Sequence, residues 1–141
     1  MATPLYTLEV LRLAASTARW DRLPAPGGTS EKRSPICGSR ITVDVVLDAE
    51  GKIAELGQEV RACALGQASA ALMGEHAIGK TAEELAAASD ALKQWLAGEM
   101  DSPGDWPGLD IFAPALPHSA RHPAIRLAFE AAAEAAAKAK P

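Results

Sequence analysis

The chain has 141 residues, the size of one domain with a single core, and we treat residues 1–141 as one domain. Its formal net charge is −4 and no basic stripe stands out, so we expect neither a nucleic acid nor an anionic membrane as a partner. No apolar run approaches the roughly 20 residues of a membrane-spanning helix, and two cysteines are too few for a disulfide framework, so we expect reduced thiols and a cytoplasmic location.

The first predicted element is a helix near the start of the chain, which Thr3 caps and in which Pro4 takes the first position. Apolar residues at the spacing of one helix face then follow, namely Leu5, Leu8, Leu11 and Ala15. After this helix, residues 22–36 combine a cluster of proline and glycine with a polar stretch. This composition predicts an exposed loop.

A hairpin is the next predicted element. Apolar residues alternate with polar ones over residues 41–47, which is typical of a half-buried strand. Asp48 to Gly51 supplies turn residues, and residues 53–62 suit a returning strand, in which Gly57 is a candidate β-bulge.

The remainder of the chain is predicted to be mainly helical. A helix over residues 65–78 ends at Gly79, and Thr81 opens a second helix with a capping box. Residues 102–117 are rich in proline and glycine and predict a loop with apolar anchors, and Pro123 begins a last helix. Its end, residues 135–141, is expected to fray.

Helix, hairpin and then helices is the element order of an α+β domain. We therefore predict a small antiparallel β-sheet packed on one side by helices.

The two cysteines are the strongest functional signal. Cys37 and Cys63 lie the same distance on either side of Glu50, in the turn of the hairpin, so the hairpin would bring both thiols to one end of the sheet. Cys63 also lies at a strand-to-helix junction, where the helix dipole and unpaired amides favour a thiolate. Gly38 follows Cys37 and lets the backbone approach an ion or a cluster closely.

Two cysteines supply only half of a metal site, because a structural zinc ion or a [2Fe–2S] cluster takes four ligands. The remaining ligands are therefore to be sought among His76, His118 and His122. Two further interpretations stay open on these residues alone. The cysteines are either two small buried apolar residues or a disulfide.

Four segments together form a pattern known from one protein family. They are Leu5-Tyr6, Pro35-Ile36-Cys37-Gly38 before the alternating strand, Cys63-Ala64-Leu65-Gly66-Gln67-Ala68-Ser69-Ala70 leading to Gly79-Lys80, and Ser119-Ala120-Arg121 before Leu127-Ala128-Phe129. In these segments the chain resembles the NifU/IscU/SufU-type iron–sulfur cluster assembly scaffolds, over nearly its whole length.

The resemblance implies a fold and a set of site residues. It implies the SufE/NifU-like (IscU-like) fold and places the family's Cys-Gly-Asp cysteine on Cys37 and its Cys-x-x-x-x-Ala-Ser cysteine on Cys63. The family's aspartate falls on Ser39 and its third cysteine on Ala124. Either His122 or His118, close to Ala124, would then replace the lost thiol in a Cys2His-type site, and we take His122 as the expected third ligand; a solvated loop histidine is the alternative.

The resemblance also implies a function. It implies a carrier and not an enzyme, which binds iron, zinc or an Fe–S cluster through Cys37 and Cys63. A cysteine desulfurase would supply sulfur, and cluster-acceptor proteins would receive the product. Two alternatives remain. One is a degenerate relative that serves as a protein-binding or regulatory module, and the other is a persulfide sulfur acceptor that uses Cys63.

Overall fold

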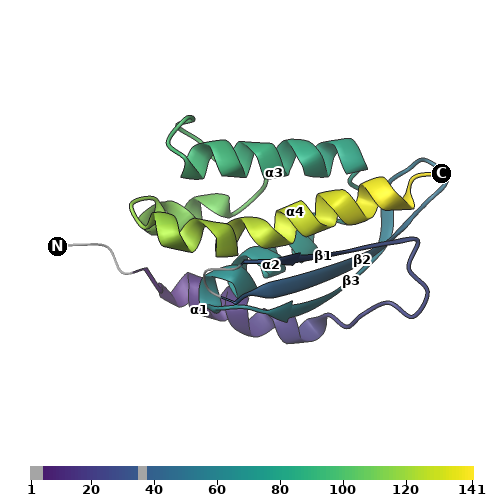
Figure 1. The fold of residues 1–141 in the computed structure, drawn as a ribbon, viewed down its shortest axis with the longest axis horizontal. Coiled ribbons are helices and arrows are strands. Elements are labelled where there is room, and N and C mark those ends of the chain that lie inside the picture. Colours follow the sequence, from purple (N-terminus) through teal and green to yellow (C-terminus); the bar gives the residue numbers. More distant parts are fainter. Residues whose placement is uncertain (1–4, 35–37) are drawn as a thin grey trace.

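A computed structural model describes residues 5–34 and 38–141. Figure 1 shows a three-stranded sheet with helices stacked on it. The strands are β1 (Gly28–Arg33), β2 (Arg40–Leu47) and β3 (Ile53–Arg61). The α-helices are α1 (Leu8–Ala15), α2 (Ala64–His76), α3 (Ala82–Leu96) and α4 (His122–Ala139), and the 3₁₀ helices are η1 (Ser16–Arg19), η2 (Leu109–Ala115) and η3 (Ser119–Arg121).

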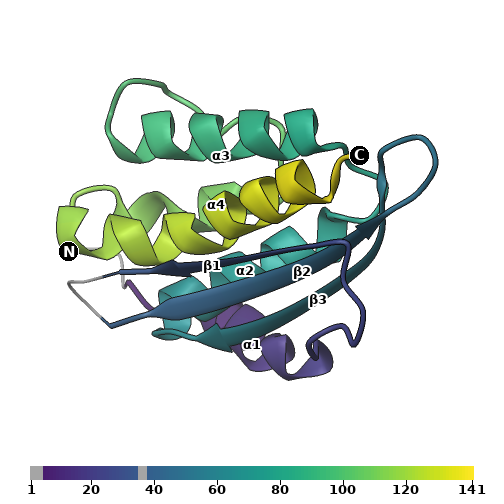
Figure 2. The same cartoon turned by 45° about the vertical axis from the view of Figure 1, so that its right-hand side comes forward.

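The sheet is antiparallel with the strand order β1-β2-β3. Helix α4 packs across β1 and β2, α2 packs against α4, α1 lies on α2, and α3 lies on α4 as the outermost helix. Figure 2 shows α2 behind the sheet, whose other face is turned toward the viewer. The helices therefore pack on one side of a small antiparallel sheet, as the sequence predicts.

The core lies between the inner face of the sheet and α4. Ile41, Val43 and Val45 alternate along β2 and are fully buried, because every second side chain of a strand points to the same face. The alanine-rich face of α4 lets the helix lie close to β1. A Cβ atom on Gly28 would lie 2.1 Å from the carbonyl oxygen of Ala135, so only glycine fits at this crossing.

The hairpin and the central helices match their predicted positions. β2 and β3 are joined at the predicted turn, where Gly51 has a φ of +79°. Thr81 and Glu84 form the predicted capping box, in which the Thr81 hydroxyl accepts from the Glu84 amide at 3.1 Å and the Glu84 carboxylate accepts from the Thr81 amide at 3.0 Å. No helix in the described part of the chain is long and apolar enough to cross a membrane.

The predictions for three irregular segments are wrong in part. The predicted loop over 22–36 contains strand β1, whose inward positions are Gly28, Ser30 and Lys32, so the strand lacks the apolar alternation that identifies strands in a sequence. The predicted loop over 102–117 contains η2, and the tail predicted to fray is helical to Ala139, with Ala135 and Ala136 fully buried.

The first helix and the bulge also differ from prediction. Thr3 and Pro4 lie outside the described residues. Helix α1 begins at Leu8, where the hydroxyl of Thr7 accepts from the amide of Val10 at 3.2 Å. The irregularity of the hairpin lies between Val46 and Leu47 and not at the predicted Gly57. A Cβ atom at Gly57 would instead lie 2.4 Å from the carbonyl oxygen of Asp21.

An ion-pair cluster joins α4 to the sheet and predicts a pH dependence. Glu134 contacts Lys32 of β1 and lies 3.1 Å from Lys138. Hydrogen bonds from Lys32 and Lys138 lower the pKa of Glu134 from 4.5 to about 2. A carboxylate with a lowered folded-state pKa stabilises the fold above its ordinary pKa, and this contribution is lost as the pH falls from 4.5 to about 2.

We expect Glu134→Gln to cost less than about 1 kcal/mol at pH 7, because the side chains of the pair are partly exposed and solvent screens them. The difference from wild type should shrink on acidification toward about pH 3. Urea unfolding at both pH values measures it, and an equal difference at both would contradict the assignment.

Candidate functional site

The register of the sheet brings the segments that carry the two cysteines to one end. Arg40 pairs with Arg33 on one side and with Arg61 on the other, so the β1–β2 loop and the β3–α2 junction leave the sheet at the same end. Cys63 follows Arg61 by two residues. Cys37 belongs to the β1–β2 loop but lies outside the described residues. We call this region, comprising residues 34–39, residues 62–66 and the first turn of α4, the thiol end.

Backbone hydrogen bonds join the two described ends of the β1–β2 loop, Ser34 and Gly38–Ser39. The amide of Ser34 donates to the carbonyl of Ser39 at 2.9 Å, and the amide of Gly38 donates to the carbonyl of Ser34 at 3.0 Å. Gly38 has a φ of +71°, which favours glycine. Ser34 and Ser39 are both buried. These bonds therefore hold the two ends of the loop close to each other at the end of the sheet.

Cys63 is the N-cap residue of α2, as its place at the strand-to-helix junction predicts. Its backbone is extended, with φ −66° and ψ 171°, and its carbonyl accepts from the amide of Gln67 at 2.9 Å. Cys63 is a half-buried free cysteine, and no side-chain capping bond is present. The first amides of a helix lack partners within the helix, so an anion on this sulfur would face donor groups.

The first turns of α2 and α4 touch at Gly66. A Cβ atom there would lie 2.7 Å from Cβ of Ala62, 3.3 Å from the carbonyl oxygen of Ala124 and 3.8 Å from Cβ of Ala124. Ser69, one turn later, donates from its hydroxyl to the carbonyl of Ile125 at 2.5 Å. Ala124, the position that the resemblance equates with a third cysteine, is therefore buried against the helix that Cys63 caps.

The surroundings of His122 limit how it could bind a metal. Nε2 of His122 lies 2.9 Å from the carbonyl oxygen of Ala115 and 3.1 Å from that of Leu116. Carbonyl oxygens only accept, so Nε2 must carry a proton and donate, which leaves Nδ1 as the only nitrogen able to bind a metal. His118 is exposed. Within residues 5–34 and 38–141, no three His, Cys, Asp or Glu side chains form a metal-binding group, so a ligand role for His122 stays a prediction.

Charged residues flank the thiol end on the outer face of the sheet. Arg33, Arg40 and Arg61 form one row across the three strands. Like charges in register repel each other, and two glutamates in the next row compensate. Arg33 lies 2.9 Å from Glu31 and holds the pKa of this carboxyl below its usual value, while Arg40 and Arg61 lie 3.7 Å and 3.5 Å from Glu59. The three arginines and two glutamates carry one net positive charge, close to the β3–α2 junction that bears Cys63.

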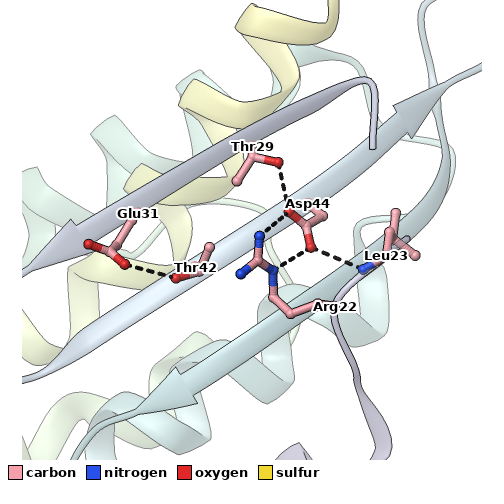
Figure 3. A network of polar contacts seen from close by, with 6 residues as sticks. All are labelled: Arg22, Leu23, Thr29, Glu31, Thr42 and Asp44. Carbon is pink, nitrogen blue, oxygen red and sulfur yellow. Dashed lines mark hydrogen bonds and ion pairs between the residues drawn. The ribbon is translucent and has the colours of Figure 1, made fainter. Parts of the chain in front are cut away.

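A second polar cluster, which the sequence did not indicate, lies further along the outer face (Figure 3). Asp44 is fully buried and accepts four hydrogen bonds: from Nε and Nη2 of Arg22 at 2.6 Å and 3.1 Å, from the amide of Leu23 at 3.0 Å and from the hydroxyl of Thr29 at 2.7 Å. Burial alone would raise the pKa of Asp44, but the hydrogen bonds from Arg22, Thr29 and Leu23 outweigh it and lower the pKa. The carboxylate therefore holds the segment before β1 against the sheet, and it is a structural group.

Comparison with known proteins gives one family and several solved structures. The family model for the NifU-like N terminal domain matches residues 14–138. The structure is similar to the N-terminal part of a NifU-like protein from Brucella abortus, with 33% identity, a TM-score of 0.87 and coverage of 95% of this chain and 93% of the other. No sequence match was found among curated proteins.

Two further structures share the fold at lower identity. One is described as an iron–sulfur cluster assembly scaffold for the SUF system from Fervidobacterium islandicum AW-1, with 20% identity, a TM-score of 0.85 and coverage of 94% of this chain and 96% of the other. The other is a hypothetical protein with 24% identity, a TM-score of 0.75 and coverage of 94% and 99%.

Proposed function

Because the chain belongs to the NifU-like N-terminal domain family of iron–sulfur cluster assembly scaffolds, we propose that it carries iron, zinc or an Fe–S cluster as cargo, bound through Cys37 and Cys63. The observation that carries this proposal is the register of the sheet. Arg33, Arg40 and Arg61 pair in one row, so the segments that bear the two cysteines leave the sheet at the same end. A cytoplasmic location, where thiols stay reduced, is part of the proposal.

The chemistry of the thiol end fits a cargo that is held loosely. Two thiolates supply half of a four-ligand set, and Ala124 offers a methyl group where the resemblance places a third thiol. The remaining ligands would come from Nδ1 of His122 or from outside the chain. Helix amides at Cys63 and the positive charge of the arginine row favour an anionic cargo at this end. A cargo with so few protein ligands is easily passed to an acceptor protein.

The decisive experiment removes one thiol. Untagged protein is reconstituted anaerobically with iron and sulfide, and iron and zinc per chain and absorption between about 300 and 600 nm are measured. We expect Cys63→Ser to abolish bound metal and colour, because a serine hydroxyl is rarely ionised and is a poor ligand. Wild-type protein without metal or colour would overturn the proposal, and binding that survives Cys63→Ser would place the ligands elsewhere.

His122→Ala provides a separate arm of the same experiment. If Nδ1 of His122 is a ligand, this variant should retain less metal than wild type. His118→Ala is the matched control, because it removes an exposed histidine at the same end of α4. Equal metal content in both histidine variants and wild type would show that neither His122 nor His118 is a ligand.

Sulfur acceptance is the second candidate, and the buried methyl group of Ala124 favours it. In this reaction the Cys63 thiolate attacks the outer sulfur of a desulfurase persulfide, a new S–S bond forms on Cys63, and the desulfurase thiolate leaves, so no external oxidant is needed. After incubation with a cysteine desulfurase and cysteine, Cys63 should gain about 32 Da, one sulfur atom, by mass spectrometry. Unchanged mass together with absence of metal would favour the protein-binding alternative.

A further inference from the structure

A buried hydroxyl at the thiol end has no role in the site as described so far. Ser34 is 3% exposed, and its Oγ atom has no hydrogen-bond partner among the described residues. Both backbone groups of Ser34 are already used, since its amide donates to the carbonyl of Ser39 and its carbonyl accepts from the amide of Gly38. Native proteins rarely bury an unsatisfied hydroxyl, because it gives up its bonds to water without replacement. The hydroxyl of Ser34 therefore has a hydrogen bond left to donate.

This hydroxyl lies on the inner side of the sheet. The arginine row points outward, and successive side chains of a strand point to opposite faces, so the adjacent residues Ser34 and Ser39 point toward the helices and are buried. The corresponding residue after β3 is Ala62, whose Cβ atom lies against Gly66 of α2. The last inward row at the thiol end is therefore made of small side chains. Ser34 stands at one end of this row, and Cys63 follows Ala62 at the other.

The chemistry of the thiol end favours an anion as the acceptor of this hydrogen bond. A serine hydroxyl is a donor that is rarely ionised, so it is a poor ligand for iron or zinc beside thiolates. The first amides of α2 lie at Cys63, and the arginine row with its glutamates carries a net positive charge. An anionic sulfur atom is thus the group that complements the free O–H of Ser34.

We propose that Ser34 is a positioning residue of the thiol end, whose hydroxyl donates a hydrogen bond to an anionic sulfur atom of the bound cluster. The inference rests on the proposed function, because it requires a cluster held by Cys37 and Cys63. A hydrogen bond to a cluster sulfur stabilises the reduced, more negative form and so raises the reduction potential. It also slows loss of a cargo for which the chain supplies few ligands.

Ser34→Ala tests the proposal, because it removes the hydroxyl and leaves the size of the side chain almost unchanged. After anaerobic reconstitution with iron and sulfide, we expect the half-life of the cluster absorption in the presence of a chelator to fall about tenfold. The reduction potential of the cluster should become more negative. Ser34→Thr retains a hydroxyl and should keep the potential close to that of wild type. Without cargo, Ser34→Ala should resist urea at least as well as wild type, since it removes an unsatisfied buried group.

Ser30→Ala is the matched control. Ser30 lies on the same strand and face, is 2% exposed and likewise has no partner for Oγ among the described residues, but it pairs with Val43 and lies away from the thiol end. This variant should keep the wild-type half-life and potential.

The outcomes separate this inference from the proposed function. Equal half-lives and potentials in Ser34→Ala, Ser30→Ala and wild type would overturn the role of Ser34 and leave cluster binding intact. A loss of stability in cargo-free Ser34→Ala with an unchanged cluster would also overturn it, because the hydroxyl would then serve the fold alone. Wild-type protein that holds no cluster would overturn both.

Discussion

Replacing Asp44 with alanine is expected to lower the free energy of unfolding by about 3 kcal/mol, because it deprives four donors of one buried acceptor. The amide of Leu23 and the hydroxyl of Thr29 would lose their partner. Arg22 is 45% exposed and can turn to water, which places the cost at the lower end for a broken buried ion pair. Urea unfolding followed by circular dichroism measures the change.

The pH dependence of the free energy of unfolding, together with an isosteric variant, isolates the contribution of the Asp44 charge. The pKa of Asp44 is lowered from 3.8, so its stabilising contribution is present above this pH and is lost as the pH falls through the folded-state pKa. Asp44→Asn keeps the shape and removes the charge, and it should fall between wild type and Asp44→Ala. Asp90→Ala removes an exposed carboxylate of α3 and should cost less than about 0.5 kcal/mol. A cost for Asp44→Ala as small as this control would show that the network contributes little.

The elements that were predicted correctly have local signals. The hairpin has alternation and a turn, and α3 has a capping box at Thr81 and one apolar face. Strand β1 lacks such a signal, because its inward positions are Gly28, Ser30 and Lys32. Its place in the sheet follows from the close approach of α4. The apolar spacing of Leu8, Leu11 and Ala15 does not identify the buried side of α1, for a similar reason. Both of its faces carry apolar residues, and only packing on α2 decides which face is buried.

In the candidate site, too, only the features with a local sequence signal were predictable. Cys63 was placed at the start of a helix by local pattern, and α2 begins directly after it. The Asp44 network joins residues about 20 positions apart, a pairing that neither periodicity nor motif reveals. Alternation places Asp44 on the outer face of the strand, and no local pattern shows that the segment before β1 covers it there. The bonds from His122 to the carbonyls of Ala115 and Leu116, at the end of η2, likewise depend on a turn that was predicted to be a loop.

Ala124→Cys is expected to increase the retention of a reconstituted cluster about tenfold or more, because each added protein ligand slows loss of the cargo. Ala124 lies against the first turn of α2, which Cys63 caps, and its neighbour Gly66 carries no side chain that would block a sulfur atom. The half-life of the cluster absorption after addition of a chelator measures the effect. A modest loss of stability, about 1 kcal/mol, is expected from the extra atom in a packed site.

A matched control separates the position of the new thiol from its mere presence. Ala86→Cys adds a thiol on the exposed face of α3 and should leave the half-life of the cluster unchanged. Combining Ala124→Cys with Cys63→Ser should return retention to a low value, because the new thiol then has only Cys37 as a partner. If Ala124→Cys and Ala86→Cys behave alike, Ala124 is not a ligand position, and cargo release is not set by the missing third thiol. If only Ala124→Cys retains the cluster, the methyl group at this position is what keeps the cargo labile.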